Sequence, residues 1–152
     1  MKRQHYDPHP GLAMAAKRAD ARNDLAHGDP QLYLKQADEY VESMFSGAKA
    51  ALRPLYDALY DLARSLGNDI KISPGKTIVP IYRHHVIAQI KPSTRTRIDF
   101  GLALGDTPAK GRLIDTGGYA KKDRITHRIE VTSLDDIDDE LKKWLKAAYA
   151  RD

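Results

Sequence analysis

The chain contains no cysteine, and this absence excludes disulfide bonds, thiol nucleophiles and thiolate metal sites together. It has no apolar run near the roughly 18 residues that a transmembrane helix needs. Its polar start also lacks the apolar segment of a signal peptide. No catalytic or metal-binding motif stands out in the remaining sequence. We therefore expect a cytoplasmic protein without a membrane span, and we assign it no metal and no cofactor.

Charge is unevenly distributed along the 152 residues. Residues 1–68 balance nine basic against nine acidic side chains, whereas residues 69–128 carry twelve Lys and Arg against five Asp and Glu. A concentrated positive field attracts phosphates, nucleic acid or anionic metabolites. A solvated sheet face without a ligand is the alternative interpretation of the same excess.

The spacing of apolar residues changes from helical to strand-like near Asn68. Two helices are expected at about 31–45 and 48–66, and Pro54 should either start or kink the second. The alternating pattern predicts strands at 69–73, 78–82, 86–91, 94–104, 111–115 and 124–132. We expect an α+β fold with two N-terminal helices, a mainly antiparallel sheet of about five strands, and a C-terminal amphipathic helix packed on the sheet.

The C-terminal helix is the best specified element of the sequence. Ser133 is the expected N-cap, with Asp136 three residues later in the position of a capping box. Acidic residues crowd the first turns and basic residues follow, which suits the helix dipole. Ile137, Leu141 and Trp144 begin its apolar stripe.

Residues 1–30 contain no clear start or stop signals, and we interpret them as an N-terminal arm with a short helix at 12–22. Residues 31–152 then form the single α+β domain. An arm of this kind packs loosely on its own domain or is exchanged with a second copy. A homodimer formed through the arm is therefore one expected partner.

Histidines offer two candidate sites. His127 shares a strand parity with Ile125 and Ile129, so it should point into the core, either as a hydrogen-bonded structural residue or as the floor of a cleft. His84 and His85 are adjacent, and on a strand they would point to opposite sides. The closely spaced ligand pairs of structural zinc sites are absent, which argues against a metal site there.

Arginines of the predicted sheet suggest an anion site. Arg95 and Arg97 should project from one face of a strand, and Arg128 has the outward parity of the last strand. If these strands are neighbours, three guanidinium groups converge on a planar oxyanion. An aromatic side chain beside them would offer a stacking surface. The candidate ligand-binding residues are Tyr82, Arg83, Arg95, Arg97, His127 and Arg128.

Several separated segments also carry a family resemblance. They are 76–83, 88–92, 97–104, 111–113, 123–129 and 135–149. In this order they resemble a bacterial domain of unknown function, number 5655, over about residues 30–151. Residues 9–14 resemble the opening of a second uncharacterised helical domain, here truncated to a remnant. The resemblance implies a compact α+β domain with an antiparallel sheet, and it implies no reaction, cofactor or catalytic residue.

Three functions follow as hypotheses from these patterns. The first is a non-enzymatic binding module whose basic sheet face holds an anionic ligand or a nucleic-acid backbone. The second is a small-molecule enzyme or sensor with a pocket between the sheet and the C-terminal helix, using His127, Tyr82 and Arg97. The third is a dimerisation or structural module that uses residues 1–30.

Overall fold

An antiparallel sheet forms the centre of the structure, a computed structural model that describes residues 4–7 and 30–152. Its strands are β1 (Lys71–Ile72), β2 (Val79–Tyr82), β3 (Val86–Pro92), β4 (Ile98–Leu102), β5 (Ile114–Asp115) and β6 (His127–Val131). They lie in the order β1-β2-β3-β4-β6-β5, and each neighbouring pair is antiparallel. The predicted α+β class is confirmed, with six strands among the described residues instead of about five.

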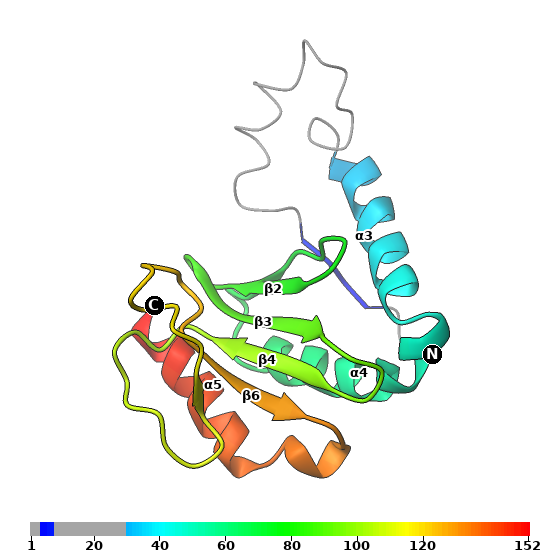
Figure 1. Cartoon of the computed structure of the whole chain (residues 1–152). Helices are drawn as coiled ribbons and strands as arrows, with labels where there is room; N and C mark the ends of the chain where they lie inside the picture. Colours follow the sequence, from blue (N-terminus) through cyan, green and yellow to red (C-terminus); the bar gives the residue numbers. More distant parts are fainter. Residues whose placement is uncertain (1–3, 8–29) are drawn as a thin grey trace.

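Buried and partly exposed side chains alternate along the strands, so one face of the sheet lies in the core. Ile90, Phe100 and Ile129 lie side by side in register on β3, β4 and β6, and all three are fully buried. Helix α5 (Asp139–Arg151) packs against β3 and β4 and contributes the buried Leu145. In Figure 1, α4 and α5 lie behind the strands, and no helix lies in front of β3, β4 and β6. No helix among the described residues covers the opposite face, which we call the open face and on which Asp99, Arg128 and Glu130 are partly exposed.

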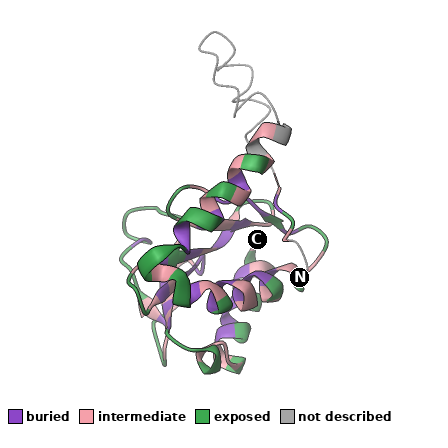
Figure 2. Ribbon diagram, turned by 90° about the vertical axis from the view of Figure 1, so that its right-hand side faces the viewer, coloured by how far each residue is buried: buried purple, intermediate pink, exposed green. Residues whose placement is uncertain are grey.

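The N-terminal helices are α3 (Pro30–Met44), the 3₁₀ helix η2 (Gly47–Leu52) and α4 (Arg53–Arg64). Gly47 has a φ of 57°, a left-handed conformation that separates α3 from η2. Pro54 lies in the first turn of α4, where its missing N–H leaves no hydrogen bond unmade. The second predicted helix is thus regular only from Arg53 onward. Figure 2 shows exposed residues along the outer sides of both α-helices.

The C-terminal helix starts later than predicted. Ser133 leads into a short 3₁₀ helix, η3 (Leu134–Asp136), and the Asp136 carboxylate accepts a hydrogen bond from the Ser133 N–H at 3.2 Å. Ile137 then has a ψ of 70°, which interrupts the helical backbone. Asp138 caps α5 by accepting a hydrogen bond from a backbone N–H in its first turn at 3.0 Å. The predicted capping box of Ser133 and Asp136 is confirmed, but it begins η3 and not α5. The prediction of one continuous helix from residue 133 was wrong, because two successive caps divide the segment.

Residues 4–7 pack against the domain between α4 and the edge strand β1. Tyr6 is 5 % exposed, and its hydroxyl lies 2.7 Å from the hydroxyl of Tyr56. The backbone N–H of Asp7 donates to the carbonyl of Ile72 at 2.9 Å, and the Asp7 carboxylate accepts from the Ile72 N–H at 2.9 Å. This short segment therefore covers part of the open edge of the sheet.

Most of the predicted arm at 1–30 lies outside the described residues, and so does the short helix expected at 12–22. The exchange of this arm between two copies stays a prediction. Within the described part of the chain, no helix is both long and apolar enough to cross a membrane.

Candidate anion-binding site

A hollow of about 690 Å³ lies where the end of α3 and the start of η2 meet the β1–β2 loop and the β3–β4 hairpin. Its volume falls within the range of small-ligand sites, about 300–1,000 Å³. The charged side chains that border it are Lys49, Lys76, Lys91, Arg97 and Asp99. Its hydroxyl groups come from Ser43, Ser46, Thr77 and Ser93. We call this hollow the basic pocket.

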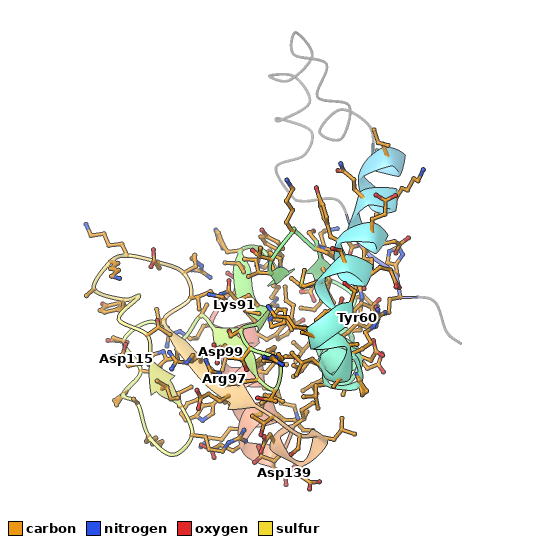
Figure 3. The ribbon with its side chains drawn as sticks, turned by 45° about the vertical axis from the view of Figure 1, so that its right-hand side comes forward. Tyr60, Lys91, Arg97, Asp99, Asp115 and Asp139 are labelled. Atoms are coloured by element: carbon orange, nitrogen blue, oxygen red, sulfur yellow. The ribbon has the colours of Figure 1, made fainter. Side chains whose placement is uncertain are left out.

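Three different elements bring the lysines of the basic pocket together. Lys49 on η2 donates its ammonium to the carbonyl of Pro92 at 2.7 Å, which joins η2 to the end of β3. Lys91 lies opposite Asp99 in the β3–β4 register and is exposed on the open face. Figure 3 shows Lys91 close to Arg97 and Asp99. Lys76 and Lys91 form no ion pair with any residue that the structure describes.

The β3–β4 turn determines the positions of Arg95 and Arg97. The N–H groups of Ser93 and Thr94 donate to the carbonyl of Arg97 at 3.1 and 3.3 Å and close the turn. Strand β4 consequently starts at Ile98, and Arg95 lies exposed in the turn. The expectation that Arg95 and Arg97 project together from one strand was wrong, because these turn hydrogen bonds replace strand pairing.

Arg97 and Arg128 do meet on the open face, around two carboxylates. Arg97 Nε lies 3.0 Å from Asp99 Oδ1 and 3.5 Å from Glu130 Oε2. Arg128 Nε lies 3.7 Å from Asp99 Oδ1 and is buried without a hydrogen-bond partner among the described residues. Two positive and two negative groups make this cluster neutral. The two carboxylates thus offset the charge of both guanidinium groups, and Arg97 also donates a hydrogen bond to Asp99.

Tyr82 and Arg83 lie at the opposite end of β3 from Arg97. Arg83 donates to Asp69 Oδ2 at 2.9 Å and to the carbonyl of Tyr149 at 2.8 Å, and its guanidinium lies 4.1 Å above the Tyr149 ring. Hydrogen bonds from Tyr149 and then Arg83 lower the pKa of Asp69. Burial raises the pKa of Tyr82, which is half-buried on the open face. Arg83 therefore joins the end of β2 to α5.

His127 points into the core, as the strand parity predicts, and is 1 % exposed. Its Nδ1 lies 2.7 Å from the Thr126 hydroxyl, and its Nε2 lies 2.8 Å from the carbonyl of Thr107. Because a carbonyl only accepts, Nε2 carries the proton and Nδ1 accepts from Thr126. Tyr82 and Arg97 project from the other face of the sheet. The expected pocket that joins these two residues to His127 is therefore not formed.

His84 and His85 surround a carboxylate. Their backbone N–H groups donate to Asp152 Oδ2 at 2.6 and 3.0 Å, and His85 Nδ1 lies 2.8 Å from Asp152 Oδ1. Arg124 Nη2 lies 3.3 Å from the same carboxylate. Burial alone would raise the pKa of Asp152, but the hydrogen bonds from His85 and then His84 outweigh it and lower the pKa to about 2. No group of three or more metal-ligating side chains occurs among the described residues.

Sequence reasoning missed part of the basic pocket. Lys76 and Lys91 belong to the positively charged segment 69–128, whereas Lys49 lies in the balanced segment and gave no signal. Lys49 lies on a different element, 42 residues before Lys91. Only the packing of α3 and η2 against the hairpin brings them near each other.

A family model described as Domain of unknown function (DUF5655) matches residues 41–151. No curated protein matches the chain, and no solved structure matches it. The match includes all six strands, α4, the whole of α5 and every residue of the basic pocket. The resemblance that the sequence motifs suggested is confirmed over this range, and the chain belongs to the DUF5655 family.

Proposed function

We propose that the protein is a non-enzymatic binding module that holds a phosphate-bearing anion in the basic pocket. One observation carries the proposal: three lysines border a hollow of about 690 Å³ whose single carboxylate, Asp99, is paired with Arg97. Like charges gathered in one hollow repel each other, and a bound anion relieves that repulsion. Lys76 and Lys91 have no ion-pair partner among the described residues, so both ammonium groups are available to a ligand.

The basic pocket is a better anion site than the arginines of the open face. Asp99 and Glu130 already neutralise Arg97 and Arg128. A ligand phosphate would have to compete with these carboxylates for the guanidinium groups. At the pocket, Lys91 and Lys76 add positive charge, and neither forms an ion pair with a residue that the structure describes. The anion site proposed here therefore lies closer to η2 than the site expected from the sequence, and the two share Arg97.

The donor groups of the basic pocket fit phosphate chemistry. Lysine presents a point charge with rotatable N–H donors, which suits an oxyanion approached from several directions. The exposed hydroxyls of Ser43 and Thr77 supply neutral donors beside the ammonium groups, whereas the Ser46 hydroxyl donates to the carbonyl of Ser43 at 2.7 Å. Such a phosphate comes from a small phosphorylated molecule or from the backbone of a nucleic acid. Both sources share the chemistry that the pocket recognises.

The proposal is tested with a double charge reversal, Lys76→Glu with Lys91→Glu. Isothermal titration calorimetry would measure the affinity for inorganic pyrophosphate, and fluorescence anisotropy would measure the affinity for a labelled single-stranded 12-mer DNA. A charged hydrogen bond contributes about 1.5–3 kcal/mol, and about 1.4 kcal/mol corresponds to a factor of ten in affinity. The double variant should therefore bind either probe at least about tenfold more weakly.

The matched control is Lys142→Glu with Lys146→Glu, which changes the net charge equally on exposed positions of α5. This control should retain the affinity, because both positions lie outside the pocket. Equal losses in the two double variants would show only a response to net charge and would overturn the proposal. If the 12-mer binds tighter than pyrophosphate and its affinity falls steeply with salt, the natural ligand is a nucleic-acid backbone.

A further inference from the structure

A second hollow, of about 670 Å³, lies at the opposite end of β4 from the basic pocket. The loop at 116–125 forms one wall, and the ends of β4 and α5 form the other. We call it the loop pocket. Its charged and aromatic side chains are Tyr119, Lys122, Asp123, Arg124 and Arg151.

A turn in the wall of the loop pocket holds a lysine where glycine is usual. The carbonyl of Gly118 accepts a hydrogen bond from the N–H of Asp123 at 2.9 Å, and the carbonyl of Tyr119 accepts one from the N–H of Lys122 at 3.0 Å. This pair of bonds forms a Schellman motif, whose left-handed position normally holds glycine. Lys122 occupies that position with a φ of 62°. It is the only non-glycine residue with a positive φ in the described part of the chain.

A lysine in this position strains the backbone, because a side chain disfavours the left-handed region that glycine enters freely. Residues in strained backbone conformations cluster at binding sites, where their function compensates for the lost stability. The left-handed φ of Lys122 therefore motivates the hypothesis that its side chain binds a ligand.

Two cations of the loop pocket are available to a ligand. Lys122 and Arg151 are exposed, and neither forms an ion pair with a residue that the structure describes. The Arg151 guanidinium lies against Gly105, where a Cβ would overlap it. Arg124 lies beside them and also contacts Asp152 at 3.3 Å. The pocket thus combines three cations with the single carboxylate of Asp123.

An exposed aromatic ring stands beside these cations. Tyr119 is 58 % exposed, and the only other large apolar residue exposed in the described part of the chain is Leu134. Nucleobases stack on exposed aromatic rings with little dependence on base identity. A flat ring next to unpaired cations is therefore complementary to a molecule that joins an aromatic base to a phosphate.

We propose that the loop pocket is a nucleotide-binding site in which Tyr119 stacks on the base and Lys122 and Arg151 bind the phosphate. The site is separate from the basic pocket, so either proposal stands without the other. The nucleotide is a free molecule or one unit of a single strand, because both present the same base and phosphate.

The test compares Lys122→Gly with Lys121→Gly, which removes the same charge from the neighbouring exposed position. Isothermal titration calorimetry with adenosine 5′-monophosphate (AMP) would measure affinity, and a thermal melt would measure stability. Lys122→Gly should raise the melting temperature, since glycine relieves the strain, and it should weaken AMP binding about tenfold. Lys121→Gly should leave AMP affinity within about twofold of the starting protein.

Further variants separate the base from the phosphate. Tyr119→Ala should weaken AMP binding about tenfold, and Tyr119→Phe should restore it, because stacking needs the ring and not the hydroxyl. Ribose 5-phosphate and adenosine should each bind at least about tenfold more weakly than AMP. If an eight-residue oligothymidylate binds tighter than AMP, the nucleotide is recognised within a strand, and the proposal is supported in that form.

The two binding proposals fail in different ways. If the Lys76→Glu, Lys91→Glu variant abolishes AMP binding and the Lys122→Gly and Tyr119→Ala variants retain it, the nucleotide binds in the basic pocket and the loop-pocket proposal is overturned. The loop-pocket proposal is also overturned if Lys122→Gly raises the melting temperature and leaves AMP affinity unchanged, or if AMP does not bind. Loss in the loop variants alone supports the loop pocket.

Discussion

Two hydrogen bonds hold the buried ring of His127. The Thr126 hydroxyl donates to its Nδ1 and also accepts from the backbone N–H of Leu104 at 3.0 Å. Thr126 is therefore the shared partner of two buried polar groups. Strand parity predicts that His127 points inward, but its second partner, the carbonyl of Thr107, lies 20 residues away and gives no signal in the sequence.

Thr126→Val should destabilise the protein by about 1–3 kcal/mol, because an isosteric methyl group leaves two buried polar groups without partners. Urea unfolding measures this free energy. Thr96→Val, at an exposed position of the β3–β4 turn, is the control and should change stability by less than about 0.5 kcal/mol. Equal stability of Thr126→Val and the starting protein would contradict the role assigned to the hydroxyl.

Asp152 makes stability depend on pH in the acid range. Its pKa is lowered to about 2 in the folded protein from an ordinary value of 3.8. Folding therefore favours the carboxylate, and the stabilisation is complete above about pH 4 and is lost as the pH falls toward 2. Asp152→Asn should lose less stability than the starting protein over this interval, as measured by thermal melts. Parallel acid profiles for the two proteins would count against the His84 and His85 contacts.

The start of α5 depends on Asp138, whose carboxylate both caps the helix and lies 2.9 Å from Arg112 Nη1. Asp138→Ala should cost about 1 kcal/mol, because it removes the cap. Asp138→Asn keeps a good N-cap and loses only a partly exposed ion pair, so it should cost less. Chemical denaturation of both variants separates the two contributions. An equal cost for alanine and asparagine would show that the ion pair and not the cap stabilises α5.

Hairpins were predictable from the sequence where side-chain alternation and turn residues agreed. The arms expected at 78–82 and 86–91 are β2 (Val79–Tyr82) and β3 (Val86–Pro92). The strand expected at 94–104 was too long, because Thr94 and Arg97 close a turn whose hydrogen bonds replace pairing. Alternation alone does not reveal which backbone groups pair.

Residues 4–7 pack against their own chain, and this packing should contribute to the stability of the whole molecule. Tyr6→Ala should lower the free energy of unfolding by about 2 kcal/mol or more, since it removes a buried aromatic side chain and leaves the Tyr56 hydroxyl unpaired. Tyr119→Ala, at an exposed ring, should cost much less. Urea unfolding provides both values.

The oligomeric state distinguishes this packing from an exchanged arm. If residues 4–7 bind their own chain, Tyr6→Ala should leave the mass in solution unchanged, and stability should not depend on protein concentration. Light scattering coupled to size-exclusion chromatography measures the mass. Conversion of a dimer to a monomer by Tyr6→Ala would instead support exchange between two copies.

The charge of the whole molecule was predictable, and the position of the candidate site was not. Lys76, Lys91 and Arg97 come from the segment that the sequence marks as positive. Lys49 comes from the balanced segment and lies near the others because η2 packs against the hairpin, where Lys49 bonds to the carbonyl of Pro92. Arg128 lies in the predicted place but is neutralised by carboxylates that share its face. Sequence parity identifies the face of a residue, and strand order identifies its neighbours.

An NMR titration of the labelled protein with inorganic pyrophosphate tests the basic pocket most directly, because each backbone amide reports separately. Saturable shifts should concentrate at residues 43–49, 76–77 and 91–97 and should disappear in the Lys76→Glu, Lys91→Glu variant. Shifts confined to the Arg128 region of the open face, or no saturable shifts, would contradict the account.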